Sequence, residues 1–158
     1  MSAAETATTS PNLIVIFTDD QGYEDLGYFG APKIKTPHID RMANEGMRFT
    51  DFYVANSVCS PSRAALLTAC YPDRVGIPNI LFPGQSLNPE ETSIVDLLKA
   101  KGYANMCVGK WHIGHKPERL PTRHVFDAYY GIPYSNDMEL DPTAIFIISC
   151  PSRIPLSL

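Results

Sequence analysis

The chain has 158 residues, of which 44% are hydrophobic, and its formal net charge at pH 7 is -4. This length suits one domain that can bury a substantial core. The acidic balance offers no basic surface for nucleic acid or for an anionic membrane, so we expect neither as a partner. The longest apolar run near the start covers only residues 13–17, which is far too short to span a membrane.

The first eleven residues contain no basic residue and no apolar stretch, so we expect a disordered arm and no signal peptide. The cysteines are too few for a disulfide scaffold and lack the spacing of zinc ligands. They leave the cellular compartment open.

A continuous apolar run predicts a buried strand over residues 12–18, and Asp19 and Asp20 follow it directly. In open α/β sheets, ligands bind at the carboxyl ends of the strands. Two adjacent carboxylates repel each other unless a cation joins them, and hard oxygen ligands favour calcium or magnesium. Such a pair on its own is more often a solvated turn.

The next segment predicts a helix over residues 37–45 that begins with a proline and ends at a glycine. The side chains of Ile39, Met42 and Ala43 share one face, so this helix should cover a core. Residues 48–54 read as another strand.

Residues 58–68 combine a cysteine, a helix-opening proline and an arginine. Pro61 is expected at the first helical position, which puts Cys59 just before a helix N-terminus. The unpaired N–H groups and the helix dipole favour an anion there, and Arg63 can reach back from one turn later. The alternative is a buried cysteine before an ordinary helix.

Residues 71–89 are rich in proline, glycine and asparagine and predict a long surface loop. A helix capped by Thr92 or Ser93 should follow and end at Gly102, and its expected inward side chains are those of Ile94, Leu97 and Leu98. Residues 103–108 predict a strand. The alternation of strands and helices indicates an α/β fold in which helices cover a mostly parallel sheet.

The seven residues after this strand, G-K-W-H-I-G-H at positions 109–115, contain a cation and a proton acceptor. In an extended segment, Lys110 and His112 lie on the same side. Residues 112–115 also spell a tetrapeptide of class I aminoacyl-tRNA synthetases. There it follows the first strand and is joined by a lysine-serine loop, whereas here it comes late and no such loop follows, so we regard it as coincidence.

Four stretches resemble motifs of the sulfatase family, of the arylsulfatase and N-acetylgalactosamine-6-sulfatase type. They are C-x-P-S-R-A-A-L-L-T from Cys59, G-Y-x5-G-K-W-H-I-G over residues 102–114, T-P-x-I-D from Thr36, and F-D-A-Y-Y-G-I-P-Y-S-N-D over residues 126–137. The resemblance runs from about Pro11 to Met138. It implies the alkaline-phosphatase-like α/β sandwich of that family, of which only the N-terminal portion is present.

By this resemblance, a formylglycine-generating enzyme oxidises Cys59 to formylglycine. One hydroxyl of its hydrate then attacks the sulfur of an aryl or carbohydrate sulfate ester. Arg63 and Lys110 would stabilise the negative charge, and His112 would act as the base.

The same resemblance implies a calcium ion held by Asp19, Asp20 and the side chain at Cys59. Some family members place the serine of the last motif in the substrate pocket, which nominates Ser135; a turn serine is the equal alternative.

The chain also departs from the family pattern. Ala69 and Val125 stand where the family usually has glycine, and Cys70 stands where it often has a basic residue. If position 125 requires a positive φ, valine would strain it.

We therefore expect a disordered arm over residues 1–11, the N-terminal part of a sulfatase catalytic domain over 12–138, and an unmatched tail over 139–158. Further metal ligands, a second histidine and a second lysine of the family have no counterparts here. The expectation is a truncated sulfatase with weak activity at most. A phosphoryl hydrolase of the same superfamily and a non-catalytic remnant are the alternatives.

Overall fold

A computed structural model describes residues 10–135 and 146–149 of the chain. The chain divides into two compact units, Met1–Phe49 and Thr50–Leu158, and each is described by itself. Most of the expected N-terminal arm and of the expected tail lies outside the described residues.

The first unit is built on α1 (Pro37–Glu45), preceded by the 3-10 turns η1 (Tyr23–Asp25) and η2 (Gly27–Phe29). The carboxylate of Asp40, in the first turn of α1, accepts hydrogen bonds from the Tyr28 N–H and the Thr36 hydroxyl, each at 2.8 Å. Thr36 also accepts a bond from the Gly27 N–H at 2.9 Å. The predicted helix is confirmed, and these bonds connect η2 to its N-terminus.

The strands predicted at 12–18 and 48–54 are wrong: within the described residues neither stretch forms a strand. Ile14 is 87% exposed, and Met42, expected on the core-facing side of α1, is 56% exposed. A strand needs a hydrogen-bonded neighbour and cover for its apolar face, and the hydrophobic pattern specifies neither.

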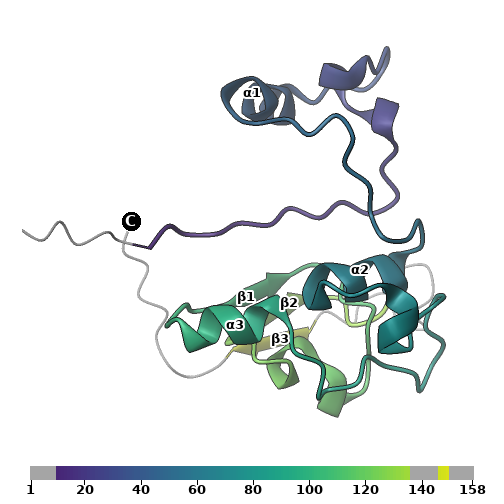
Figure 1. The fold of residues 1–158 in the computed structure, drawn as a ribbon, viewed down its shortest axis with the longest axis vertical. Coiled ribbons are helices and arrows are strands. Elements are labelled where there is room, and N and C mark those ends of the chain that lie inside the picture. Colours follow the sequence, from purple (N-terminus) through teal and green to yellow (C-terminus); the bar gives the residue numbers. More distant parts are fainter. Residues whose placement is uncertain (1–9, 136–145, 150–158) are drawn as a thin grey trace, which may run out of the picture. The chain divides into compact units, whose positions relative to one another are not determined.

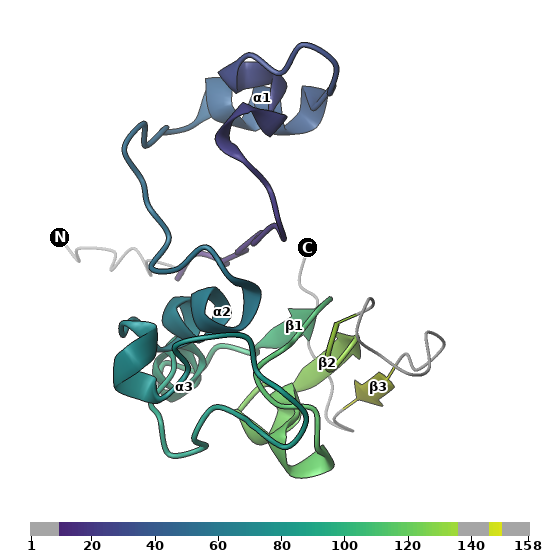
Figure 2. The ribbon, with the colours of Figure 1, turned by 90° about the vertical axis from the view of Figure 1, so that its right-hand side faces the viewer.

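The second unit contains a three-stranded sheet in the order β1 (Met106–Val108), β2 (Ala128–Gly131) and β3 (Phe146–Ser149). β1 and β2 run parallel with Cys107 opposite Tyr129, and β3 pairs antiparallel to β2. Figure 2 shows the three strands side by side. The predicted strand over 103–108 is confirmed in its second half.

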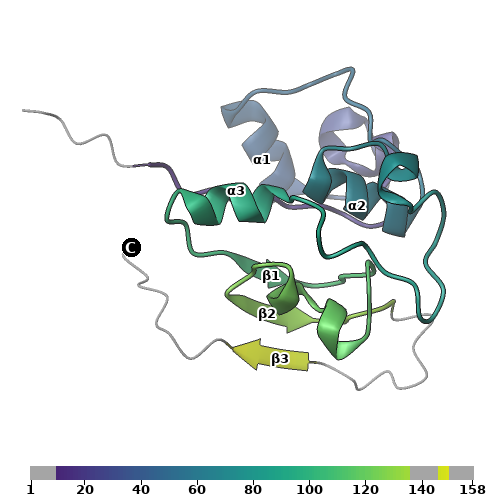
Figure 3. The same cartoon turned by 60° about the horizontal axis from the view of Figure 1, so that its bottom comes forward.

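Two helices, α2 (Cys59–Thr68) and α3 (Ile94–Ala100), lie along one face of this sheet (Figures 1 and 3). Short 3-10 turns complete the unit: η3 (Pro72–Val75), η4 (Pro117–Arg119) and η5 (Pro121–Arg123). The α/β prediction is therefore confirmed, with a small parallel pair of strands and covering helices. No helix in the part of the chain that the structure describes has the length and hydropathy of a membrane span.

Residues 71–89 form a loop apart from η3, as predicted, and most of them are exposed, but the stretch also supplies much of the core. Ile77 and Leu87 are each 1% exposed, and the Leu87 N–H donates to the Ile113 carbonyl at 3.0 Å. The apolar residues of this proline- and glycine-rich stretch do not recur at the spacing of a helix or a strand, so the sequence did not indicate that they are buried. The buried hydrophobic cluster consists of Ala64, Val75, Ile77, Leu81, Leu87, Trp111, Ile113 and Tyr129.

The N-cap of α3 is predicted correctly, but its inward face is not. Ser93 caps the helix by accepting from the Asp96 N–H at 3.3 Å, and the Asp96 carboxylate accepts from the Ser93 N–H at 2.7 Å. Val95 is 3% exposed, whereas Ile94 and Leu97 are 46% and 59% exposed. A helix of seven residues with apolar side chains on both sides leaves its rotation undecided by sequence.

His124 is a buried titratable residue next to this core. Its ring packs against Trp111 with centroids 5.5 Å apart, and it is 6% exposed. Burial, aided by the positive charge of Arg119, lowers the pKa of His124, while Asp96 acts in the opposite direction.

The lowered pKa of His124 predicts a loss of stability in acid. The stabilisation from neutral His124 is fully present above its ordinary pKa of 6.5 and is lost as the pH falls through the folded-state value. We predict that the urea midpoint of unfolding declines as the pH is lowered below 6.5. The decline should be shallower in His124→Phe, which keeps a ring against Trp111 but cannot titrate. An equal slope in both proteins would show that His124 does not contribute.

Candidate active site

Cys59 is the first residue of α2, whose N-cap is Val58. The Val58 carbonyl accepts the first helical bond, from the Ser62 N–H at 3.1 Å, and the Val58 N–H donates to the Asn56 side chain at 2.8 Å. The helix thus begins two residues earlier than Pro61 predicted, since proline is tolerated throughout the first turn, where helical N–H groups have no partner in the helix. Cys59 is half-buried at this end, its thiol not in a disulfide.

Arg63 connects α2 to the segment that follows β1. Its guanidinium Nη1 donates to the Lys110 carbonyl oxygen at 2.5 Å, across 47 residues of sequence. A hydrogen bond from a charged donor contributes more than a neutral one, about 1.5–3 kcal/mol. Arg63, which the sequence placed one turn after Cys59, therefore contacts the backbone of the G-K-W-H-I-G-H segment at residues 109–115.

Residues 109–112 continue alongside the end of β2. The Gly109 N–H donates to the Tyr130 carbonyl at 2.8 Å, Trp111 to Ile132 at 2.9 Å, and His112 to Pro133 at 3.1 Å. These bonds bring the carboxyl ends of two parallel strands to the same edge, where an α/β sheet places its ligands.

Gly131 makes this close approach possible. A Cβ atom at Gly131 would lie 2.0 Å from the Gly109 carbonyl oxygen, and its φ is 159°. Only a residue without a side chain fits at this distance.

His112 and Ser135 are buried at this edge, 1% and 2% exposed. The imidazole of His112 meets the Tyr134 ring edge to face, with centroids 4.8 Å apart and planes at 86°. Lys110 is half-buried on the same segment. The second unit thus holds Cys59 and Arg63 on α2 and joins that helix to the stretch carrying Lys110 and His112, with Ser135 following β2.

Asp19 and Asp20 belong to the first unit, where both are exposed and Asp20 has a φ of 52°. Their carboxylates are the oxygen donors that calcium prefers, but calcium takes about six to eight oxygens. Within residues 10–135 and 146–149, no three His, Cys, Asp or Glu side chains gather as a metal-binding group. The carboxylates of Asp19 and Asp20 therefore suit calcium chemically, but on their own they would supply only part of its coordination shell.

Among the residues that the structure describes, four other than glycine adopt a positive φ: Asp20, Ala69, His112 and Val125, at 52°, 54°, 56° and 68°. Ala69 and Val125 are the two positions at which the resemblance leads us to expect glycine. The departures therefore fall on left-handed backbone, and a β-branched valine there costs about 1–3 kcal/mol.

Cys107, on β1, is not a second nucleophile. Burial raises its pKa to about 11, although the Arg63 charge acts in the opposite direction. Its thiol stays protonated at neutral pH, and thiolate is the reactive form.

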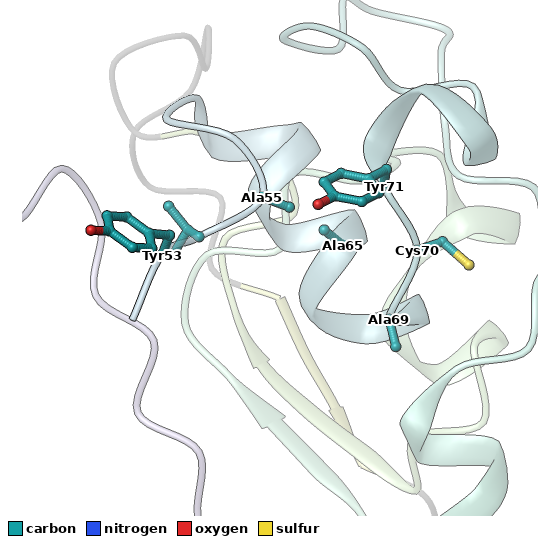
Figure 4. A pocket seen from close by; sticks show the side chains of 7 residues that line it. Tyr53, Ala55, Ala65, Ala69, Cys70 and Tyr71 are labelled. Atoms are coloured by element: carbon teal, nitrogen blue, oxygen red, sulfur yellow. The ribbon is translucent and has the colours of Figure 1, made fainter. Parts of the chain in front are cut away.

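A cavity of about 340 Å³ lies at the other end of α2 (Figure 4). Ala65, Ala69 and Cys70 contribute to its wall with Tyr53, Val54, Ala55 and Tyr71. None of the predicted site residues lines it, so we place the candidate active site at the start of α2 and at the strand ends.

The sequence reasoning missed Ser60 and Tyr134. Ser60 is fully buried, and its hydroxyl accepts from the Leu81 N–H at 3.2 Å; the Tyr134 hydroxyl donates to the Leu81 carbonyl at 2.9 Å. Ser60 is adjacent to Cys59, and Tyr134 is adjacent to Ser135. Both bond to the backbone of Leu81, which lies in the stretch 71–89 that we expected on the surface, so the sequence showed no sign of these contacts.

The chain is similar to known proteins in sequence and in fold. The Sulfatase family model matches residues 11–147. Arylsulfatase A of Bos taurus is 46% identical over 142 residues, covering 87% of this chain and 28% of that protein. N-acetylgalactosamine-6-sulfatase of Sus scrofa is 44% identical, covering 80% of this chain and 26% of that protein.

Two solved structures are similar as well. A Bacteroides thetaiotaomicron protein from a locus for glycosaminoglycan metabolism has a TM-score of 0.73 at 39% identity, covering 80% of this chain and 29% of its own. A sulfatase from Pseudoalteromonas sp. has a TM-score of 0.68 at 39% identity, with 75% and 25% covered. The chain spans about a quarter of the length of its curated relatives. The Sulfatase model matches most of the chain, including the segments that carry Cys59 and His112. The chain therefore belongs to the sulfatase family.

Proposed function

We propose that this chain carries the nucleophile-bearing part of a sulfuric ester hydrolase, with Cys59, Arg63, Lys110 and His112 as its catalytic residues. The observation that supports the proposal most is the hydrogen bond from Arg63 to the Lys110 carbonyl, which joins the start of α2 to the strand-end segment. Hydrolysis would convert a sulfate ester and water into an alcohol and inorganic sulfate.

The chain's own groups would act on the developing charge. Arg63 and Lys110 are fixed cations, which stabilise negative charge on sulfate oxygens better in a partly buried site than in water. His112 would accept a proton, since imidazole titrates near neutral pH. Ser135 would orient the substrate by hydrogen bonding.

Cys59 is the proposed site of oxidation to formylglycine by a formylglycine-generating enzyme; the hydrated aldehyde supplies one hydroxyl as nucleophile and a second for release of sulfate. Its place at the first turn of α2 supports the proposal, because N–H groups there favour an anion. We propose Asp19 and Asp20 as ligands of a calcium ion, which when bound would polarise the sulfate group.

The substrates of similar proteins support a proposal about the substrate class. One similar structure, with a TM-score of 0.67 at 32% identity, is described in complex with its substrate D-glucosamine-2-N,6-O-disulfate. We propose an aryl or carbohydrate sulfate ester for this chain.

Maturation of Cys59 is tested by mass spectrometry after coexpression with a formylglycine-generating enzyme. Trypsin should release Cys59 in the peptide of residues 49–63 and Cys70 in the peptide of residues 64–74. We predict the mass of an aldehyde in place of the thiol in the first peptide and an unchanged thiol in the second. Cys59→Ala should show no converted peptide and no turnover of an aryl sulfate. A thiol that persists at Cys59, with turnover retained in Cys59→Ala, would refute the assignment.

Calcium binding is tested by titration calorimetry and by thermal unfolding. With only part of a coordination shell, we predict weak binding, of the order of 1 mM, comparable to that of weak extracellular calcium modules. Calcium at ten times this value should raise the free energy of unfolding by about 1.4 kcal/mol. Asp19→Asn combined with Asp20→Asn removes both charges and should abolish the effect.

Asp73→Asn is the matched control, because Asp73 is an exposed carboxylate in η3. Calcium binding that survives in the double variant, or that is lost equally in Asp73→Asn, would contradict the assignment.

A further inference from the structure

Tyr134 contacts His112 of the candidate site with its ring and the backbone of Leu81 with its hydroxyl. Its ring meets the His112 imidazole edge to face at 4.8 Å and lies tilted against the His115 ring at 5.5 Å. Its hydroxyl donates to the Leu81 carbonyl at 2.9 Å in a buried environment. The side chain is 9% exposed, so ring and hydroxyl are both shielded from water.

The anchor of this hydroxyl is itself fixed to α2. The Leu81 N–H donates to the Ser60 hydroxyl at 3.2 Å, and Ser60 follows Cys59 in the first turn of the helix. The peptide groups of Leu81 are thus bound by α2 on one side and by Tyr134 on the other. A buried carbonyl left without its donor would cost about 1–3 kcal/mol, which holds the Tyr134 hydroxyl in place.

His112 depends on its surroundings for its orientation. Its φ of 56° lies in the left-handed region, which is uncommon for residues other than glycine. Its N–H donates to the Pro133 carbonyl at 3.1 Å, and this bond fixes the backbone but not the side-chain torsions. A perpendicular ring against the imidazole restricts rotation, because aromatic pairs prefer this geometry.

We propose that Tyr134 is a positioning residue that fixes the orientation of the His112 imidazole relative to the start of α2, through its ring on one side and its hydroxyl on the other. The role of His112 as a base rests on the function proposed above; its orientation by Tyr134 does not.

Two variants separate the ring from the hydroxyl. Tyr134→Phe keeps the edge-to-face contact and removes the bond to Leu81, so the ring is in place but loosely held. Tyr134→Leu removes both. The disturbance of His112 should therefore increase from wild type to Tyr134→Phe to Tyr134→Leu.

The measurement is NMR of the full chain with histidine labelled in the ring, with His112 assigned from the spectrum of His112→Asn. We expect the imidazole signals of His112 to shift and broaden in Tyr134→Phe, and to shift further with an altered titration midpoint in Tyr134→Leu. The single indole N–H signal, from Trp111, whose Nε1 donates to the Arg119 carbonyl at 3.0 Å, should stay in place because the core is intact. If Tyr134→Leu does not fold, the His112 signals of Tyr134→Phe alone decide whether the proposal holds.

Tyr129→Phe is the matched control. It removes another buried tyrosine hydroxyl, which donates to the Gly109 carbonyl at 3.3 Å on the same segment as His112. The proposal is overturned if His112 is unchanged in the Tyr134 variants that fold, or moves as much in Tyr129→Phe. It is also overturned if the Trp111 signal moves together with His112, because that reports a general loosening. None of these readings requires turnover, so they separate this proposal from the sulfatase assignment.

Discussion

The Arg63 guanidinium donates to the backbone carbonyl of Lys110, and this contact joins two segments that are far apart in sequence. On one side is the helix that begins with Cys59. On the other is the stretch of residues 109–112, held against the end of β2 and the residues after it by four backbone hydrogen bonds. Since a cationic side chain that is hydrogen-bonded to a carbonyl has little freedom to move, the residue that we propose as a source of positive charge also connects the two segments.

Left-handed backbone occurs at several positions of the second unit. His112, Ala69 and Val125 adopt left-handed backbone although none is glycine. Such residues persist where surrounding bonds over-determine the chain, as they do at His112, and they cluster at sites where a side chain must be aimed. The close backbone approach at Gly131 belongs to the same arrangement, because it allows the two strand ends to meet.

Local chemistry made much of the second unit predictable. The cap at Ser93 and the strand leading into Gly109 follow from hydrogen-bonding groups and periodicities within a few residues of each other, and both are found. The nominated residues around Cys59 and His112 came from a resemblance in spacing, not from periodicity.

What the sequence could not provide depends on contacts between distant segments. The core contribution of Ile77 and Leu87 has no period, and the rotation of α3 is undecided by its own residues. The strands expected at 12–18 and 48–54 require neighbours that a single apolar run does not specify. Tyr134 was passed over for Ser135 because its importance lies in a bond to Leu81, 53 residues away.

The most direct test of the contact from Arg63 to Lys110 is amide hydrogen exchange in Arg63→Gln. Loss of a charged hydrogen bond worth roughly 1.5–3 kcal/mol should speed local opening about tenfold or more. We predict this acceleration at the N–H groups of Trp111 and His112, with little change in Arg74→Gln, where an exposed arginine of η3 is altered. Unchanged protection at both amides in Arg63→Gln would contradict the central claim that Arg63 holds the candidate site together.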